Sequence, residues 1–310
     1  MYLYAPTSDS EPSSDGCVVA LGCFDGLHVG HLALLARARA EADKRGLPLV
    51  LYSPEARKGQ AYLTTPEEKT HLLYAFGADR VILADFDAIK DLSAESFVSE
   101  ILCAQLSCRC ALCGYNFRFG KYAAGSSDTL GQLLQAHGAD TVVLPAVKSK
   151  GEDVSSTRIR ALIQCGRIED ANDLLCKPFS VMGTVSKGRQ IGRTLGFPTA
   201  NLPFPMGKLI PRNGVYYCHV KTRLGIFGAV ANIGIHPTFD DQPERPVLEA
   251  HLLSFDGDLY GEEVQVSLLR FLREEKKFSD PAVLAATVHA DMHTAMQLAA
   301  TDPILMKGSS

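Results

Sequence analysis

The chain has 310 residues, of which 46% are hydrophobic and 21% charged, and its formal net charge is −4. This length can hold two domains of ordinary size, and the composition is typical of a soluble globular protein. The charge balance excludes a strongly basic nucleic-acid surface, and no apolar run reaches the length of a membrane span. The opening MYLYAPTSDSEPSSDG has no basic segment before an apolar one, so we expect no secretory signal and a cytoplasmic protein.

Nine cysteines are present, and four of them crowd into CAQLSCRCALC as Cys103, Cys108, Cys110 and Cys113. Their spacing does not give the two CxxC pairs typical of a zinc site. A metal site therefore stays the weaker alternative, and a buried strand ending at Gly114 is favoured. The odd number of cysteines, without a secretory signal, indicates reduced thiols.

Patterns of strand and helix alternate through the first half of the chain. Such alternation predicts a parallel sheet covered by helices, an α/β fold. Short apolar runs predict strands at 17–22, 46–53, 78–85 and 110–114, and helical patterns cover 31–45, 64–77 and 93–106.

The second half has frequent glycines and short alternating runs separated by turn signals. This pattern predicts a small antiparallel β-barrel or sandwich closed by a helix at 280–300. The alternating runs lie at 214–222, 227–234, 247–255 and 263–273. We expect the boundary within 176–183, which gives domains 1–176 and 177–310. Low complexity is expected only in the N-terminal tail and the final KGSS.

The stretch LGCFDGLHVGHLALL, residues 21–35, places His28 and His31 where the first strand gives way to the first helix. Ligands of parallel sheets bind at the carboxyl ends of strands, and helix N-termini favour anions. Gly26 and Gly30 would let the backbone approach a phosphate closely. Two imidazoles there could donate hydrogen bonds to a leaving pyrophosphate, but a pair of ordinary capping histidines is an equal alternative from these residues alone.

Two segments together resemble a known family. GCFDGLHVGH is similar to the GxFDGxHxGH signature of the HxGH nucleotidyltransferases, and VSSTRIRALIQCG resembles their second signature, a Ser/Thr-Arg segment that opens a helix. The resemblance implies that His28 and His31 are catalytic. It further implies an ATP and phosphate site formed by Gly22, Phe24, Asp25, Gly26, Gly30, Ser156, Thr157 and Arg158.

The segment CGYNFRFGKYAAGSSDTL resembles the GxDFRFGxxxxG segment of prokaryotic FAD synthetases, which move AMP from ATP onto FMN. The resemblance implies flavin contacts from Asn116, Phe117 and Arg118. Asn116 stands where the family usually has Asp, and Cys23 where it usually has Asn. Because an amide cannot serve as a charged ligand or base, a weak or silent adenylyltransferase is the alternative interpretation.

A second glycine-rich stretch, GTVSKGRQIGRTLGFPTAN, covers residues 183–201. Its Lys and Arg side chains could hold phosphates, but it is no P-loop, and on glycine count alone a β-hairpin is favoured. Its ending resembles the PTAN motif of riboflavin kinases, which implies Mg²⁺ ligands at Thr199 and Asn201. The implied ATP and Mg²⁺ site comprises Gly183, Gly188, Gly192, Arg193, Pro198, Thr199 and Asn201.

Further along, ANIGIHPTF and VLEAHLLSFDGDLYGEEVQVSLLRFLREEKKF also resemble riboflavin kinase segments. The resemblance implies that Glu249 is the general base, although by itself it could be a cross-strand partner on an exposed face. Arg273 is implied as a flavin contact. His236 and His251 are interpreted as structural.

The resemblance runs from about residue 17 to about residue 293 and is to the prokaryotic bifunctional riboflavin kinase/FAD synthetases. It implies phosphorylation of riboflavin to FMN and adenylylation of FMN to FAD, with ATP and Mg²⁺ and without a covalent enzyme intermediate. A non-catalytic flavin-binding protein and a nucleotidyltransferase for another substrate are the remaining alternatives. We expect small-molecule partners and a monomer or loose homo-oligomer.

Overall fold

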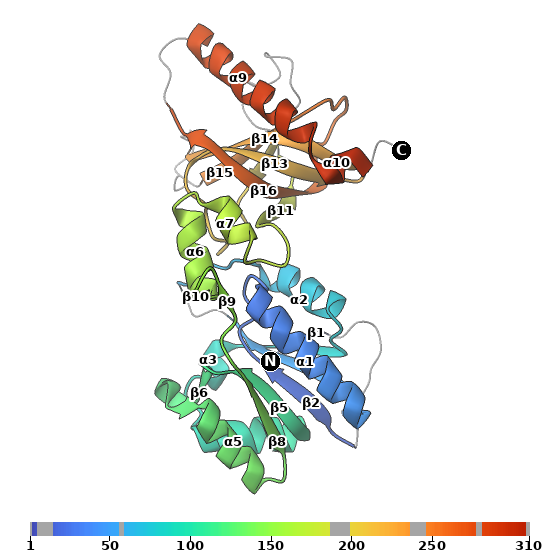
Figure 1. The fold of residues 1–310 in the computed structure, drawn as a ribbon, viewed down its shortest axis with the longest axis vertical. Coiled ribbons are helices and arrows are strands. Elements are labelled where there is room, and N and C mark those ends of the chain that lie inside the picture. Colours follow the sequence, from blue (N-terminus) through green and yellow to red (C-terminus); the bar gives the residue numbers. More distant parts are fainter. Residues whose placement is uncertain are drawn as a thin grey trace. The chain divides into compact units, whose positions relative to one another are not determined.

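The computed structural model describes residues 2–4, 15–55, 59–186, 199–235, 246–276 and 281–307. The chain divides into two compact units, residues 1–156 and 157–310 (Figure 1). Each unit has its own sheet and its own helices, as the sequence predicts. The functional boundary expected at residue 176 stays a prediction.

The first unit is built on a six-stranded sheet in the order β1-β4-β3-β2-β5-β8. The predicted parallel α/β sheet is confirmed, because every neighbouring pair from β4 to β8 is parallel. The exception is β1, an antiparallel edge strand in the tail where low complexity was expected. Its sequence, Tyr-Leu-Tyr, is typical of strands, but three residues are too few to predict one. The strands are β1 Tyr2–Tyr4, β2 Cys17–Leu21, β3 Leu49–Pro54, β4 Arg80–Ala84, β5 Cys108–Gly114 and β8 Asp140–Leu144.

Helices cover this sheet and follow the predicted positions closely. In α2, Thr65 and Glu68 form a capping box and Pro66 occupies the first turn, as the start signals predict. The helix expected at 93–106 is present, but most of it, η1, has π geometry. The elements are α1 Val29–Arg45, α2 Pro66–Ala75, α3 Phe86–Ile89, α4 Ala94–Ser96, η1 Phe97–Gln105 and α5 Ser127–Ala136. Short strands complete the unit: β6 Arg118–Phe119, β7 Gly125–Ser126, β9 Lys148–Ser149 and β10 Glu152–Asp153.

The cysteine-rich segment is a buried strand, as predicted. Cys108, Cys110 and Cys113 all lie in β5 and are buried. Cys17 of the neighbouring β2 donates a hydrogen bond from Sγ to the Leu106 carbonyl at 3.0 Å. Burial raises the pKa of Cys17 to about 11 and that of Cys113 to about 12, so these thiols stay protonated at neutral pH.

The second unit contains an antiparallel six-stranded sheet in the order β11-β16-β13-β14-β15-β12. Ser186, just after β11, bridges to Asn201 of β12, so the sheet almost closes into a barrel. The predicted small antiparallel barrel and its closing helix are confirmed. The strands are β11 Ser180–Thr184, β12 Thr199–Pro203, β13 Gly214–Thr222, β14 Gly225–Ile235, β15 Pro246–Leu252 and β16 Glu263–Glu274. The helices are α6 Ser156–Gln164, α7 Ile168–Asn172, α9 Pro281–Ala299 and α10 Pro303–Lys307.

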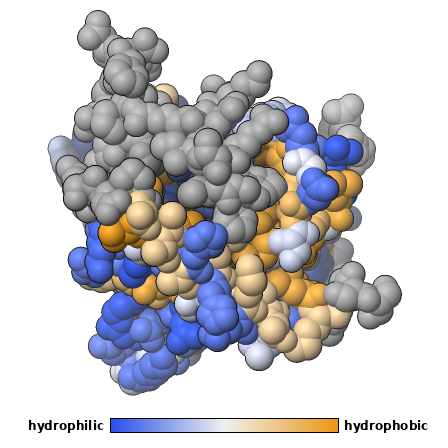
Figure 2. Space-filling view, turned by 90° about the horizontal axis from the view of Figure 1, so that it is seen from above, coloured by the Kyte–Doolittle hydropathy of each residue, from blue (hydrophilic) through white to orange (hydrophobic). Residues whose placement is uncertain are grey.

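The two faces of the barrel sheet differ in character. Alternate residues such as Leu202, Leu248 and Ala250 are fully buried and fill the interior. On the opposite face, Val230 belongs to an apolar cluster with Met292 of α9, so this helix covers part of the outer surface. The end of the molecule drawn in Figure 2 shows apolar patches beside hydrophilic residues. Across the described ranges, no helix is both long and apolar enough to cross a membrane.

Candidate active sites

The turn between β2 and α1 has an unusual backbone. Phe24 (φ 48°), Gly26 (φ 81°) and Leu27 (φ 38°) all adopt left-handed conformations. For a bulky residue such a conformation costs about 1–3 kcal/mol and persists only where the surroundings enforce it. Here Phe24 and Leu27 are fully buried, so packing holds the turn in shape.

Asp25 braces this turn against a neighbouring segment. Its carboxylate, 5% exposed, accepts hydrogen bonds from the backbone N–H groups of Leu63 and Thr64, at 2.9 to 3.1 Å. The Thr64 hydroxyl donates to the same carboxylate at 3.2 Å and accepts from the Gly26 N–H at 3.1 Å. Asp25, expected at the ATP site, therefore holds the loop that would carry ATP.

His28 and His31 stack on each other at the start of α1, with ring centroids 3.6 Å apart and planes 14° apart. His28 is the N-cap residue, and its Nδ1 accepts the His31 N–H at 3.2 Å. In a neutral ring the proton then lies on Nε2, which is left as a donor. A Cβ at Gly30 would lie 3.1 Å from the His28 ring, so the glycine gives this ring its space.

Both imidazoles are neutral at physiological pH. Burial lowers the pKa of His28 to about 4. Burial, with repulsion from Lys69 and from His28 when it is protonated, holds the pKa of His31 well below its usual range. His31 Nδ1 is buried without a hydrogen-bond partner in the described part of the chain. The pair can therefore serve as hydrogen-bond donors and dipoles, and it brings no positive charge of its own.

The second signature begins beside the first. Ser156 Oγ donates a hydrogen bond of 2.8 Å to the Asp25 carbonyl, 131 residues away along the chain. Ser156 is also the first residue of α6, whose first turn contains Thr157 and Arg158. Thr157 is exposed and Arg158 half-buried.

Gly22, also predicted at the ATP site, lies close to the Phe24 ring. A Cβ at Gly22 would lie 3.2 Å from this ring, so the position favours a small residue.

A cavity of about 560 Å³ lies in the first unit, and Leu21, the last residue of β2, is one of its lining residues. Its walls are mostly aromatic and apolar, as in many small-molecule sites. Three cations and one carboxylate complete it, namely Lys90, Arg118, Lys121 and Asp91. The remaining lining residues are Tyr52, Pro54, Phe86, Ile89, Phe97, Phe117, Phe119, Gly120, Tyr122 and Ala123.

Of the three predicted flavin contacts, Phe117 and Arg118 line this cavity and Asn116 does not. Asn116 is exposed, and its Oδ1 lies 3.3 Å from where a Cβ on Gly114 would be. Sequence reasoning missed Tyr122, which lines the cavity although 92% of it is exposed. The sequence signal that could have indicated Tyr122 is a single aromatic residue followed by the small residues Ala123, Ala124 and Gly125.

In the second unit, three polar residues form a row across the outer face of the sheet. Asn201 of β12 lies opposite Glu249 of β15, which in turn lies opposite Asn232 of β14. Asn201 is 4% exposed and Glu249 is half-buried. Thr199 lies opposite His251 in the next row. Burial lowers the pKa of His251, and its Nδ1 has no hydrogen-bond partner among the described residues.

Only some of the other predicted kinase residues lie in the part of the chain that the structure describes. Gly183 lies in β11, where an added Cβ would make ordinary contacts, the nearest at 3.7 Å, so space does not require a glycine. Thr199 is described by its backbone alone. Gly188, Gly192, Arg193, Pro198 and His236 lie outside the described residues.

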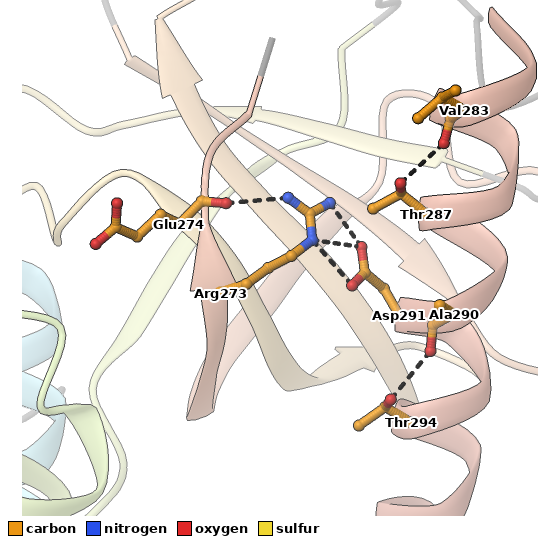
Figure 3. A network of polar contacts seen from close by, with 7 residues as sticks. All are labelled: Arg273, Glu274, Val283, Thr287, Ala290, Asp291 and Thr294. Atoms are coloured by element: carbon orange, nitrogen blue, oxygen red, sulfur yellow. Dashed lines mark hydrogen bonds and ion pairs between the residues drawn. The ribbon is translucent and has the colours of Figure 1, made fainter. Parts of the chain in front are cut away.

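Arg273 of β16, predicted as a flavin contact, is engaged within the protein (Figure 3). Its guanidinium donates to both carboxylate oxygens of Asp291 in α9, at 2.7 to 3.1 Å, and to the Glu274 carbonyl at 3.0 Å. The two side chains are only 22% and 12% exposed. This bidentate pair links the barrel to α9, a structural role that the sequence pattern did not indicate.

Comparison with known proteins assigns both units. The FAD synthetase family matches residues 10–158, and the riboflavin kinase family matches residues 175–299. The fold and the two family matches define a two-module enzyme class, an adenylyltransferase unit followed by a kinase barrel.

Relatives of known name extend over almost the whole chain. The bifunctional riboflavin kinase/FMN adenylyltransferase of Escherichia coli K12 is 35% identical over 301 residues, covering 93% of this chain and 94% of that protein. The protein of the same name from Pseudomonas fluorescens is 34% identical and covers 97% and 98%. A crystal structure described as a macrolide-efflux protein from Streptococcus pneumoniae superposes with a TM-score of 0.82 at 29% identity, covering 93% and 95%. The chain belongs to the family of bifunctional riboflavin kinase/FMN adenylyltransferases.

Proposed function

We propose that the first unit transfers AMP from ATP to FMN and that the second unit phosphorylates riboflavin, so that the chain makes FAD in two steps. The observation that carries this proposal is the stacked histidine pair at the N-terminus of α1, next to a strand end that opens into an aromatic cavity. The placement of individual site residues is part of the proposal.

In adenylyl transfer, a phosphate oxygen of FMN attacks the α-phosphorus of ATP while the bond to the leaving pyrophosphate breaks. The charge that grows on the phosphate oxygens needs donors already in place. His28 Nε2–H is such a donor, because Nδ1 is occupied by the His31 N–H. The free N–H groups at the start of α1 add to it. No step requires a covalent bond to the protein.

The aromatic cavity is the proposed flavin site. Phe97, Phe117 and Phe119 lie in one contacting aromatic group, with centroids 5.4 to 5.6 Å apart, and offer apolar surface to a flat ring system. Leu21, a lining residue of the cavity, is also the last residue of β2 and so lies just before the turn that carries the histidines. FMN held here would lie beside the nucleotide, with its phosphate near the cations that line the cavity.

In the kinase unit, Glu249 is the proposed general base that takes the proton from the ribityl hydroxyl as this oxygen attacks the γ-phosphorus of ATP. The hard oxygen donors of Asn201 and Thr199 fit Mg²⁺, and these residues would hold the ion. When bound, Mg²⁺ supplies neutralisation of phosphate charge. Asn201 is set two residues from Thr199 on one strand and directly opposite Glu249.

For Arg273, a flavin contact would have to use the N–H groups that Asp291 and Glu274 leave free. We infer that its first task is to fix α9 on the barrel. A direct flavin contact remains a secondary part of the proposal.

The surroundings of Asn116 favour a working adenylyltransferase over the silent alternative. Asn116 is not among the residues that line the cavity, so the missing carboxylate removes no lining group. The Cys23 backbone carbonyl accepts hydrogen bonds from Ser53 and Lys69, which a side-chain substitution at this position leaves in place. Neither substitution disturbs the histidine pair.

We further propose a cytoplasmic monomer or loose homo-oligomer. All nine cysteines are free of disulfides, as suits a reducing compartment.

A flavin product assay tests the proposed function. The full chain is incubated with ATP and Mg²⁺, once with riboflavin and once with FMN, and the flavins are separated by chromatography. FAD from both substrates supports two working units. FMN from riboflavin with no FAD from either substrate would contradict the adenylyltransferase assignment, and Asn116→Asp would then show whether Asn116 is the cause.

A further inference from the structure

Lys69 is a buried cation beneath the turn that carries the histidine pair. It lies in α2 and is only 2% exposed. Its Nζ donates to the Ser53 hydroxyl at 3.0 Å and to the Cys23 carbonyl at 3.3 Å. The Ser53 hydroxyl, itself fully buried, donates to the same carbonyl at 2.9 Å. Lys69, Ser53 and Cys23 thus form a closed triangle.

This arrangement is costly for the fold. An ammonium group that is buried loses its favourable hydration free energy, and hydrogen bonds to neutral oxygens compensate for only part of that loss. Burial lowers the pKa of Lys69, while the nearby charges of Asp25 and Glu55 favour its charged form. A buried methionine would fill similar space without this cost, so a role of the charge itself needs to be considered.

The charge lies close to the histidine pair, which adds no positive charge of its own. His28 and His31 are neutral, while ATP and pyrophosphate carry several negative charges. Lys69 is close enough to His31 to influence its titration. The Cys23 carbonyl that Lys69 holds comes directly before the left-handed residues of the turn.

We propose that Lys69 is a positioning residue for adenylyl transfer, which fixes the turn through the Cys23 carbonyl and supplies a buried positive charge close to the two histidines. This inference rests on the proposed function of the first unit. Lys69 does not act on the reacting atoms directly, because its Nζ is used by Ser53 and Cys23 and is shielded from solvent.

Three variants of the full chain test this role, and the kinase reaction of the same molecule is the internal reference. In Lys69→Met we expect kcat for FAD formation to fall about a hundredfold, the loss typical of a missing electrostatic contact. The KM for FMN should stay within about threefold, because the flavin cavity does not include Lys69. Lys69→Arg should recover at least about tenfold of the lost rate, because it restores the charge. Lys44→Met, an exposed lysine of α1, is the matched control.

Thermal unfolding of each variant distinguishes an effect of the substitution on catalysis from an effect on the stability of the fold. If Lys69→Met melts like the parent and keeps its kcat, or if Lys69→Arg recovers nothing, the inference is overturned. Should Lys69→Met fail to fold, Ser53→Ala decides, because it keeps the charge and removes one acceptor. A drop in kcat of about threefold to tenfold supports the role, and a parental kcat overturns it. Absence of FAD from the parent chain itself would instead contradict the proposed function.

Discussion

The two units position their reacting groups in different ways. In the first unit a strained turn carries the histidines. Residues distant in sequence, Leu63, Lys69 and Ser156, donate hydrogen bonds to this turn. In the second unit the strand register places Asn201 opposite Glu249 across a sheet face. The turn depends on buried hydrogen bonds, whereas the row depends on sheet pairing. The first site should therefore be sensitive to changes in its supports, and the second mainly to changes in its own side chains.

The largest expected effect is in the second unit. Glu249→Gln should lower the rate of FMN formation from riboflavin by roughly 10²–10⁴-fold, because it removes the proposed base while keeping size and register. FAD formation from supplied FMN should stay at the parental rate. The product assay measures both, and Glu263→Gln, an exposed residue of β16, is the control. An unchanged kinase rate would show that Glu249 is only a cross-strand partner.

The mirror experiment is in the first unit. His31→Ala should lower FAD formation from FMN by about a hundredfold, or ~3 kcal/mol of transition-state stabilisation, and should leave the kinase reaction intact. His71→Ala, an exposed histidine of α2, controls for the loss of an imidazole. Equal loss of both activities would contradict the division of labour between the two units.

Acid should destabilise the first unit through His28. Its pKa is about 4 in the folded protein and near 6.5 when unfolded, so the unfolded chain binds more protons between these values. The free energy of unfolding should therefore fall by about 3 kcal/mol as the pH drops from 7 to 4. In His28→Asn, which keeps a good N-cap residue, this part of the pH dependence should vanish. Urea unfolding followed by circular dichroism at several pH values measures the difference, and parallel curves for the two proteins would refute it.

The smallest effect concerns the cavity. Tyr122→Ala should raise the KM for FMN by about threefold to tenfold, the loss expected from one aromatic contact. Its kcat and its thermal stability should hardly change, because Tyr122 is 92% exposed. Phe76→Ala, an exposed aromatic outside the cavity, is the comparison. If both variants keep the parental KM, Tyr122 does not touch the flavin.

Local signals predicted most of the fold. The capping box at Thr65 and the alternation along β13 are written in adjacent residues, and both elements formed where expected. The π geometry of η1 depends on packing elsewhere in the chain, so no local pattern predicts it, and the three residues of β1 are too few to predict a strand. The expected flavin contact of Asn116 stays a prediction, although Asn116 is not among the residues that line the cavity.

Roles that depend on a distant partner were beyond the sequence. Lys69 reads as an ordinary helix lysine until Ser53 and Cys23 are found beside it. The pair that Arg273 forms with Asp291 could not be predicted from the motif that contains Arg273. The sequence therefore predicts which chemical groups are present at a site more readily than what supports them.

The cations that line the proposed flavin cavity would have a kinetic consequence. Riboflavin is uncharged, whereas FMN carries a phosphate, so the kinase reaction adds negative charge to the flavin. Two of these cations are paired, Lys90 with Asp87 at 2.7 Å and Lys121 with Asp91 at 3.3 Å, so attraction for the phosphate would rest mainly on Arg118. Attraction over a distance of about one Debye length would speed the encounter with FMN and leave that with riboflavin unchanged. The cavity would thus sort the two flavins by ionic attraction before any ring is bound, and added salt would erase that preference first.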